Sequence, residues 1–242
     1  LEDAGVVDRD GLLLGGAASV SLALAGCNSS GRQDQLAARA PNPKALSPRS
    51  GAERATASPQ YIALYGAVSD KFPVNALKAG VVPETFWRME VDYATSELPG
   101  TIIVDPRAHY LYFVMSGGRA MRYGVGVGKQ GFSWNGEAII RYKQEWPDWY
   151  PPMEMIERDP SIKERVSTLQ SGLGVPGGLS NPLGARAMYL WQGNKDTLFR
   201  IHGTLEPWSI GKNVSSGCIR MVNQDVIDLY GRVATGTTVK VI

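Results

Sequence analysis

The chain has 242 residues, of which 43% are hydrophobic and 20% are charged, with 25 Lys and Arg against 23 Asp and Glu. This length suits one sizeable domain with appendages rather than two large domains. The formal charge of +2 excludes a strongly basic nucleic-acid binder, so we expect no nucleic-acid partner. Two cysteines and two histidines are too few for a disulfide-rich scaffold or a zinc finger.

An uncharged apolar run at residues 12–25 comes directly before Gly26 and Cys27. It is too short for an ordinary transmembrane helix and is typical of the apolar part of a secretory signal. Leu24–Cys27 resembles the lipobox of bacterial lipoproteins, so we expect a signal peptide at 1–26 and a lipid anchor on Cys27. The acidic flank before the run departs from the usual positive one, and a buried helix with an incidental cysteine is the alternative.

Residues 27–60 follow as the lipidated cysteine and a linker rich in Ala, Ser, Pro and Arg. They contain too little apolar surface to offset the entropy of ordering, so we expect disorder there. All the aromatic residues lie at Tyr61 or later, which places the folded domain at about 61–242. We divide it into an N-terminal extension, 61–98, and a catalytic domain, 99–242.

The folded part is expected to be mainly β, a sandwich or barrel-like domain with one or two short helices. Strands are predicted at 101–105, 109–115, 120–127, 198–202 and 237–242, with turn residues between the first three. A helix is predicted at 224–233 with Asn223 as its N-cap, and a shorter one near 161–168. The Gly-, Pro- and Trp-rich stretches 128–160 and 171–187 are predicted to be loops, and loops of that length are usually functional.

The residues that could take part in catalysis are concentrated in 201–221, IHGTLEPWSIGKNVSSGCIRM. Cys218 follows a Ser-Ser-Gly sequence and lies 16 residues after His202, and a nearby imidazole is the usual means of generating a nucleophilic thiolate. Gly217 would permit close approach of a substrate carbonyl, and the backbone N–H groups of 216–218 could face an oxyanion. Arg220 could lower the pKa of the thiol or hold a substrate carboxylate.

Each of these residues also has an ordinary structural explanation. A lone cysteine is most often a small buried side chain, a lone histidine is most often structural, and Arg220 could be a surface ion-pair partner. The combination in one segment favours a catalytic site.

This segment resembles the active-site signature of the L,D-transpeptidases, the YkuD-like domain, in which a histidine is followed by Ser-x-Gly-Cys-x-Arg. PGTIIVDPRAHYLYF, RYGVGVG and NPLGARAMYL resemble further family segments, and the resemblance covers about 99–242. It implies that Cys218 is the nucleophile, that His202 is the general base and later acid, and that the Gly203 carbonyl orients the imidazole. Ser215, Ser216, Gly217 and Arg220 are then the oxyanion and substrate-binding residues.

The implied reaction is acyl transfer on peptidoglycan stem peptides. A tetrapeptide stem is the donor, a second stem peptide or a protein amine is the acceptor, and no metal or organic cofactor is required. The family also implies acylation by carbapenems. Asn28 after the cysteine resembles lipoproteins sent to the outer membrane, so we expect a periplasmic, lipid-anchored protein of a Gram-negative bacterium.

The sequence departs from the family pattern at two places, and it leaves several alternative functions open. Ser216 stands where many relatives have histidine, and the segment 132–153 replaces the short Thr-Pro-x-Gly turn of many members. Its Trp146, Trp149 and Tyr150 suggest either a lid over the substrate or a rigid packed loop. An L,D-carboxypeptidase, an enzyme that attaches an outer-membrane protein to peptidoglycan, and a non-catalytic wall-binding lipoprotein are the alternative functions.

Overall fold

The computed structural model describes residues 58–128, 135–215 and 217–242. The predicted signal peptide, the lipidation site Cys27 and nearly all of the predicted linker lie outside the described residues. No helix in the described part of the chain is long and apolar enough to span a membrane.

The described residues form three α-helices and several short 3-10 helices among mainly β structure. The α-helices are α1 (Pro59–Tyr65), α2 (Met153–Arg158) and α3 (Asn223–Arg232), and the 3-10 helices are η1 (Glu84–Phe86), η3 (Pro160–Glu164) and η4 (Pro207–Ser209). The strands are β1 (Met89–Asp92), β2 (Ile102–Asp105), β3 (Tyr110–Met115), β4 (Arg119–Gly124), β5 (Val127–Gly128), β6 (Gly136–Glu145), β7 (Ser167–Leu169), β8 (Gly172–Gly174), β9 (Arg186–Gln192), β10 (Lys195–His202), β11 (Asn213–Ser215), β12 (Ile219–Arg220) and β13 (Thr238–Val241). The predicted mainly β fold with few short helices is confirmed.

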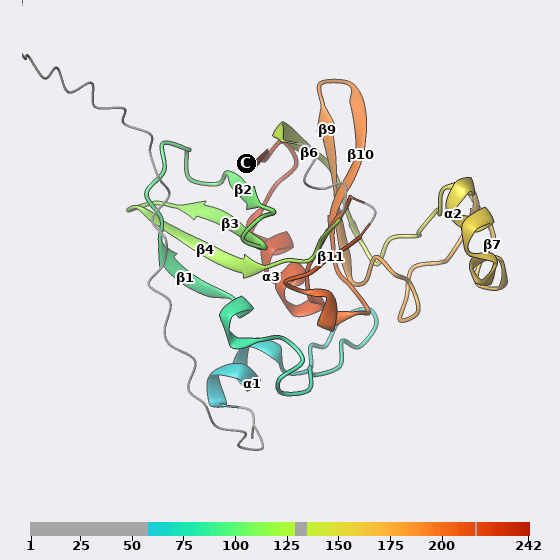
Figure 1. The fold of residues 1–242 in the computed structure, drawn as a ribbon, viewed down its shortest axis with the longest axis horizontal. Coiled ribbons are helices and arrows are strands. Elements are labelled where there is room, and N and C mark those ends of the chain that lie inside the picture. Colours follow the sequence, from blue (N-terminus) through green and yellow to red (C-terminus); the bar gives the residue numbers. More distant parts are fainter. Residues whose placement is uncertain (1–57, 129–134, 216) are drawn as a thin grey trace, which may run out of the picture. The chain divides into compact units, whose positions relative to one another are not determined.

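Nine of the strands form one mixed sheet in the order β1-β4-β3-β2-β13-β6-β9-β10-β12. Figure 1 shows strands β1 to β4 in green on one side and the β9–β10 hairpin in orange on the other, with α3 between them. β5 and β11 form a separate parallel pair, and β7 and β8 form a separate antiparallel pair. The candidate site lies at the β12 end of the large sheet.

The main core fills the space between the two halves of the sheet and α3. Its fully buried members include Ile102 and Leu111 on one half and Leu190 and Ile201 on the other, and α3 contributes Leu229. Because α3 follows β12 after only two residues, burial of this helix also fixes the strand that follows Cys218.

The prediction that 128–160 is a loop is wrong for β6. This ten-residue strand pairs with β13 on one side and with β9 on the other. Only Ala138 and Ile140 are buried along it, and the register shifts at Arg141. A bulge of this kind interrupts the two-residue alternation by which a strand is recognised in sequence. The predicted loop 171–187 likewise contains β8 and the first residues of β9.

Three smaller predictions also need correction. Pro59 and Gln60, assigned to the linker, begin α1, whose Ser58 Oγ accepts a hydrogen bond from the Tyr61 N–H. Asn223 is the first residue of α3 rather than its N-cap, and the cap position is Val222. The short helix expected near 161–168 is found slightly earlier, as η3 with α2 before it.

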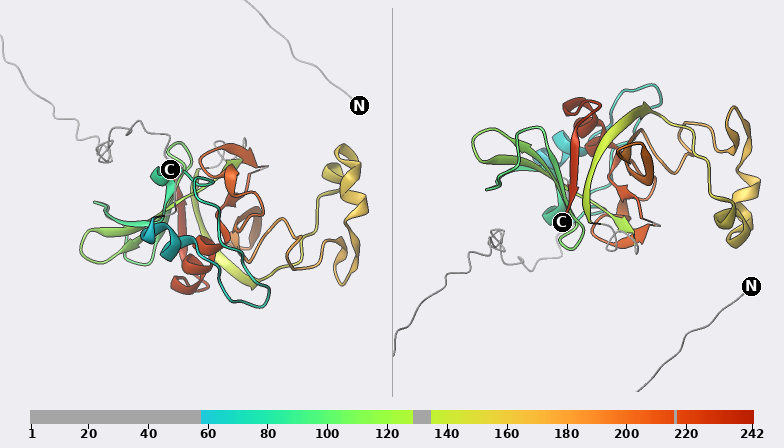
Figure 2. Two further views of the ribbon diagram at one scale, coloured as in Figure 1. Left: turned by 90° about the horizontal axis from the view of Figure 1, so that it is seen from below. Right: turned by 90° about the horizontal axis from the view of Figure 1, so that it is seen from above.

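An arm formed by residues 150–174 leaves the sheet between β6 and β9. It contains α2, η3, β7 and β8, and Figure 2 shows this yellow segment extending from the body in both views. Reciprocal main-chain hydrogen bonds between Trp149 and Val175 close its base. At the base Trp146 is buried against Phe72, with 5.1 Å between ring centroids. Trp146 is therefore part of the packed interior, whereas Tyr150 remains partly exposed.

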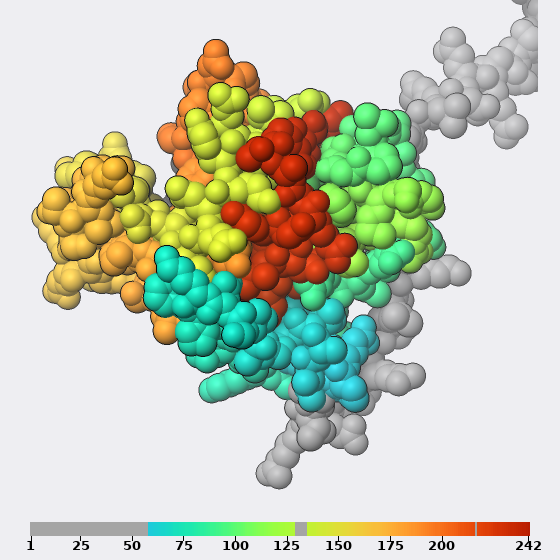
Figure 3. All heavy atoms as spheres, turned by 180° about the vertical axis from the view of Figure 1, so that it is seen from behind, coloured from blue at the N-terminus to red at the C-terminus, as the bar shows by residue number. Residues whose placement is uncertain are grey.

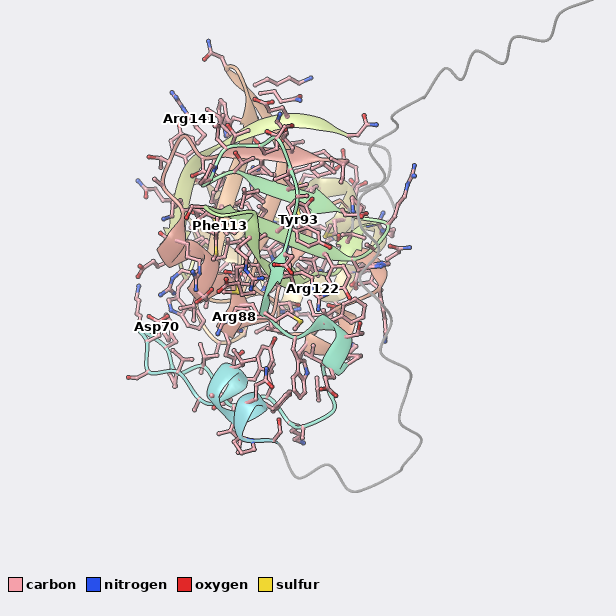
Figure 4. All side chains as sticks on the ribbon, turned by 90° about the vertical axis from the view of Figure 1, so that its left-hand side faces the viewer. Asp70, Arg88, Tyr93, Phe113, Arg122 and Arg141 are labelled. Carbon is pink, nitrogen blue, oxygen red and sulfur yellow. The ribbon has the colours of Figure 1, made fainter. Side chains whose placement is uncertain are left out.

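The segment 58–92 packs against α3 through a buried polar network. Figure 3 shows this cyan segment beside the red C-terminal part of the chain, and Figure 4 labels Arg88 within the contact. The Tyr65 hydroxyl donates to Asp225 Oδ2 at 3.3 Å and accepts from the Arg88 N–H at 2.8 Å. Arg88 Nη1 lies 3.7 Å from Asp225 Oδ1 and 3.2 Å from Asp228 Oδ1.

Asp225 makes the stability of this contact dependent on pH. Burial raises the pKa of its carboxyl group to about 7, against the opposing effect of the Arg88 charge. The folded chain therefore binds this proton more tightly than the unfolded chain, so the stabilising contribution is complete below about pH 4 and is lost as the pH rises towards 7.

We predict that the unfolding free energy of Asp225→Asn falls less than that of wild type between pH 4.5 and pH 7.5. The reason is that the amide has no proton to release. Denaturant unfolding of both proteins at each pH in this range measures the difference between their unfolding free energies. The contributions of the other titrating groups are the same in both proteins and cancel in this difference. Parallel curves for the two proteins would show that Asp225 does not titrate in this range.

Candidate active site

Parallel pairing of β10 with β12 brings the predicted catalytic residues together. Ile201 lies opposite Ile219 and His202 lies opposite Arg220. Ile201 and Ile219 are both in the core, so the residues on either side of each point to the opposite face. His202 and Cys218, which comes directly before β12, therefore lie towards the outer face of the sheet as diagonal neighbours.

His202 is held as a neutral imidazole with one defined tautomer. Its Nδ1 lies 2.6 Å from the Gly203 carbonyl oxygen, which can only accept, so Nδ1 carries the proton. The neutral ring then has its lone pair on Nε2. Burial lowers the pKa of His202 to about 4, and the nearby charges of Arg220 and Arg200 act in the same direction. At neutral pH the side chain can accept a proton, as a general base requires.

Cys218 is a partly exposed free thiol in an electropositive environment. Burial raises the pKa of the Cys218 thiol, while the Arg200 N–H and the charges of Arg200 and Arg220 lower it. Its Sγ lies 3.9 Å from the Leu198 carbonyl oxygen. The resting site therefore favours a thiol beside a neutral imidazole, and two arginines stabilise the thiolate as it forms.

Ser215 and Gly217 shape the turn that presents the cysteine. The Ser215 hydroxyl donates to the Cys218 carbonyl at 2.6 Å, and the Gly217 N–H donates to Ser215 Oγ at 3.3 Å. Gly217 has a φ of +126°, and a Cβ there would lie 2.8 Å from the Phe199 ring. A Cβ on Gly128 would lie 2.1 Å from the Gly217 nitrogen. The turn is thus packed against two neighbours, and the Gly217 N–H is engaged within the turn.

Gly203 is required at its position by the side chain of Asn223. A Cβ on Gly203 would lie 2.2 Å from Asn223 Oδ1, which accepts a hydrogen bond from the Ala185 N–H at 2.9 Å. Asn223 Nδ2 also donates to the Thr204 carbonyl at 3.3 Å. Asn223 therefore connects α3 to the segment that carries the Gly203 carbonyl.

Arg220 shares the outer face with His202 and forms an ion pair with Glu206. Its Nη1 lies 2.7 Å from Glu206 Oε2, and the glutamate side chain is half exposed. A substrate carboxylate that binds Arg220 has to share or replace this partner.

Arg200 is a site residue that the sequence analysis missed. Arg200 comes two residues before His202 on β10, so both side chains point to the same face. Because His202 lies opposite Arg220, Arg200 lies level with Cys218. Its guanidinium makes two hydrogen bonds to the Asp196 carboxylate, at 2.7 and 2.8 Å, and lies 4.5 Å from the Tyr189 ring centroid. The signal was the two-residue strand periodicity before His202, which is regular from Arg200 onwards; the bulge between Asp196 and Arg200, with Leu198 at a φ of +62°, lies before it.

Two predicted residues, Ser216 and Cys27, lie outside the described residues. The other predicted site residues, Cys218, His202, Gly203, Ser215, Gly217 and Arg220, are found in one region around the β10–β12 pair. Within the described ranges no three His, Cys, Asp or Glu side chains are grouped so that they could hold a metal ion.

The structure is a mainly β domain that carries a cysteine and a histidine on one face of the β10–β12 pair. Residues 99–241 match the family model YkuD, the L,D-transpeptidase catalytic domain. The chain therefore belongs to the L,D-transpeptidase family, a family of cysteine transpeptidases.

Two relatives from Escherichia coli are named as members of the same family. The chain is 34% identical over 122 residues to "Probable L,D-transpeptidase ErfK/SrfK", covering 49% of this chain and 36% of the relative. It is 28% identical over 147 residues to "Probable L,D-transpeptidase YbiS", covering 59% of this chain and 44% of the relative. The chain thus spans less than half of the length of either relative.

A similar solved structure comes from Brucella melitensis and is described as a probable carnitine operon oxidoreductase. It is 52% identical, covers 64% of this chain and 92% of its own, and has a TM-score of 0.44. The family assignment rests on the sequence match of residues 99–241.

We predict that Arg200→Met raises the pKa of the Cys218 thiol, because it removes a fixed positive charge beside the sulfur. The pH midpoint of iodoacetamide alkylation at Cys218, followed by peptide mass spectrometry, should move up by about 1 pH unit. Arg200→Lys keeps the charge and should restore most of the wild-type midpoint.

The matched control is Arg232→Met, which removes another arginine paired with an aspartate four residues earlier, on α3. Its midpoint should equal that of wild type. An unchanged midpoint in a folded Arg200→Met variant would exclude an electrostatic role for Arg200.

Proposed function

We propose that this protein is an L,D-transpeptidase that acts on peptidoglycan stem peptides through a Cys218 thioester and forms 3→3 cross-links. The observation that carries the proposal is the placement of Cys218 and His202 on one face of the β10–β12 pair, with the imidazole oriented by the Gly203 carbonyl. Family membership supports the same chemistry.

In the first half-reaction His202 Nε2 takes the thiol proton while Cys218 Sγ attacks the carbonyl carbon of the diamino acid at stem position three. The positive charges of Arg200 and Arg220 favour the thiolate at this stage. The resulting imidazolium donates its proton to the amine of the terminal D-Ala as the carbon–nitrogen bond breaks. The products are a thioester on Cys218 and free D-Ala.

In the second half-reaction an acceptor amine attacks the thioester carbonyl. His202 accepts a proton from the amine, the carbon–sulfur bond breaks, and the thiolate recovers a proton from the imidazolium. A diamino acid of another stem gives the 3→3 cross-link. A protein amine would give attachment of that protein to the wall, and water would give carboxypeptidase activity.

For its location we propose an exported protein anchored by lipid at Cys27, with its domain in the periplasm of a Gram-negative bacterium. The apolar run before Gly26 and Cys27 supports this proposal, as does Asn28 after the cysteine. Labelling of cells with a radioactive fatty acid should mark the wild-type protein and leave Cys27→Ser unmarked. Absence of label from wild type would exclude the anchor.

We predict that the purified protein converts disaccharide-tetrapeptide into a cross-linked dimer with loss of one D-Ala. Cys218→Ala should reduce the rate to background, because no thioester can form. His202→Gln should reduce it by a factor of about 10² to 10⁴, the usual range for general acid–base catalysis. Product masses and initial rates are measured together.

The control variant is His109→Gln, which changes the other histidine of the sequence. This residue forms a hydrogen bond with the Asn213 side chain. It should retain wild-type activity within about twofold. Release of D-Ala without dimer would identify a hydrolase, and wild-type rates in Cys218→Ala would disprove the catalytic assignment.

A further inference from the structure

The outer face of strands β6, β9 and β10 carries a group of aromatic side chains. On the core face of β9, Met188 and Leu190 are fully buried, whereas Tyr189 and Trp191 alternate with them and point to the other face. Tyr142 on β6 lies opposite Tyr189, and its side chain is 51% exposed. Aromatic groups gathered on the solvent side of a sheet are typical of a binding surface.

The strand register connects this group to the nucleophile. Tyr142 lies opposite Tyr189, Tyr189 lies opposite Arg200, and Arg200 lies beside Cys218. The row crosses three strand spacings, which is about 14 Å from Tyr142 to Cys218. β12 is the last strand of the large sheet, so within this sheet the outer face extends from Cys218 towards β9 and β6.

Polar groups accompany the rings along this row. The Tyr189 hydroxyl donates to Gln144 Oε1 at 2.6 Å, and the Tyr142 and Trp191 rings meet edge to face with 5.7 Å between centroids. We call the surface formed by Tyr142, Gln144, Tyr189 and Trp191 the aromatic face.

The aromatic face combines one exposed ring, Tyr142, and two partly buried rings with uncharged hydrogen-bonding groups, namely tyrosine hydroxyls and an amide. Sugar rings present C–H groups on their flat faces and hydroxyl or acetamido groups at their edges, which suits this combination. Of the charged groups next to it, Asp196 and Arg200 are paired with each other, and the Arg141 guanidinium lies 6.0 Å from the Tyr142 ring centroid. The rings and the amide themselves are uncharged, which suits neutral sugar rings better than a charged peptide.

We propose that the aromatic face binds the N-acetyl sugar rings of the glycan strand that carries the donor stem peptide. The inference rests on the proposed function for the identity of the substrate. Three stem residues between the reacting carbonyl and the sugar span about 10 Å when extended, and the group that joins peptide to sugar adds a few ångströms. This reach matches the distance from Cys218 to Tyr142.

The first test compares kcat/KM for disaccharide-tetrapeptide and for the free tetrapeptide of the same sequence. Wild type should prefer the disaccharide substrate, and Tyr142→Ala should reduce that preference by about tenfold, the effect expected for loss of one aromatic stacking partner. The rate with free tetrapeptide should stay within about twofold of wild type. Tyr142→Phe keeps the ring and should keep most of the preference.

A matched control is Tyr93→Ala, which removes a tyrosine that stacks on Tyr112 near the other end of the sheet. It should change neither rate. Equal use of both substrates by wild type, or an equal loss on both substrates in Tyr142→Ala, would overturn the proposal.

A second test separates this proposal from the proposed function, because it needs no catalysis. The Cys218→Ala protein is titrated with a peptide-free N-acetylglucosamine tetramer by calorimetry, with and without the additional Tyr142→Ala change. Binding that weakens about tenfold with Tyr142→Ala supports a sugar site even if no turnover is found. Absence of binding, or binding that is insensitive to Tyr142, overturns it.

Discussion

The parallel pairing of β10 with β12 is the constraint on which the candidate site depends. This short contact places His202 opposite Arg220 and leaves Cys218 as the diagonal neighbour of the imidazole. It also sets Arg200 beside the sulfur, so one register determines the positions of the imidazole, the thiol and two positive charges. A shift by one residue would exchange the core face and the catalytic face and bury the cysteine among apolar residues.

The surrounding structure holds this register from two directions. On one side the Ser215 hydroxyl bonds the Cys218 carbonyl, and Gly128 allows the turn to approach β5 closely. On the other side α3 begins directly after β12, and Asn223 connects it to the segment of Gly203. The segment 58–92 packs on α3 through Tyr65, Arg88 and Asp225, so an N-terminal region far from Cys218 in sequence supports the helix behind the site.

The parts of the candidate site that are close in sequence were predicted as one group. Cys218, His202 and Gly203 belong to the segment 201–221, and the predicted strand 198–202 is the C-terminal part of β10. The positions of Arg200 and Tyr142 relative to Cys218 could not be found in this way, because they depend on the pairing of separate strands, and a bulge at Arg141 also shifts the alternation of β6. Their relation to Cys218 exists only once β6, β9, β10 and β12 are aligned. Long-range register of this kind is not contained in the periodicity of any single segment.

The proposed mechanism requires that Cys218 forms a covalent acyl intermediate that His202 helps to make and resolve. The most direct measurement is the intact mass of the protein after brief incubation with a tetrapeptide donor and an acid quench. Wild type should carry one tripeptide acyl group, located on Cys218 by peptide mapping, and His202→Gln should accumulate it much more slowly. An acyl group on any other residue, or product formation by a protein that lacks the Cys218 thiol, would contradict the account.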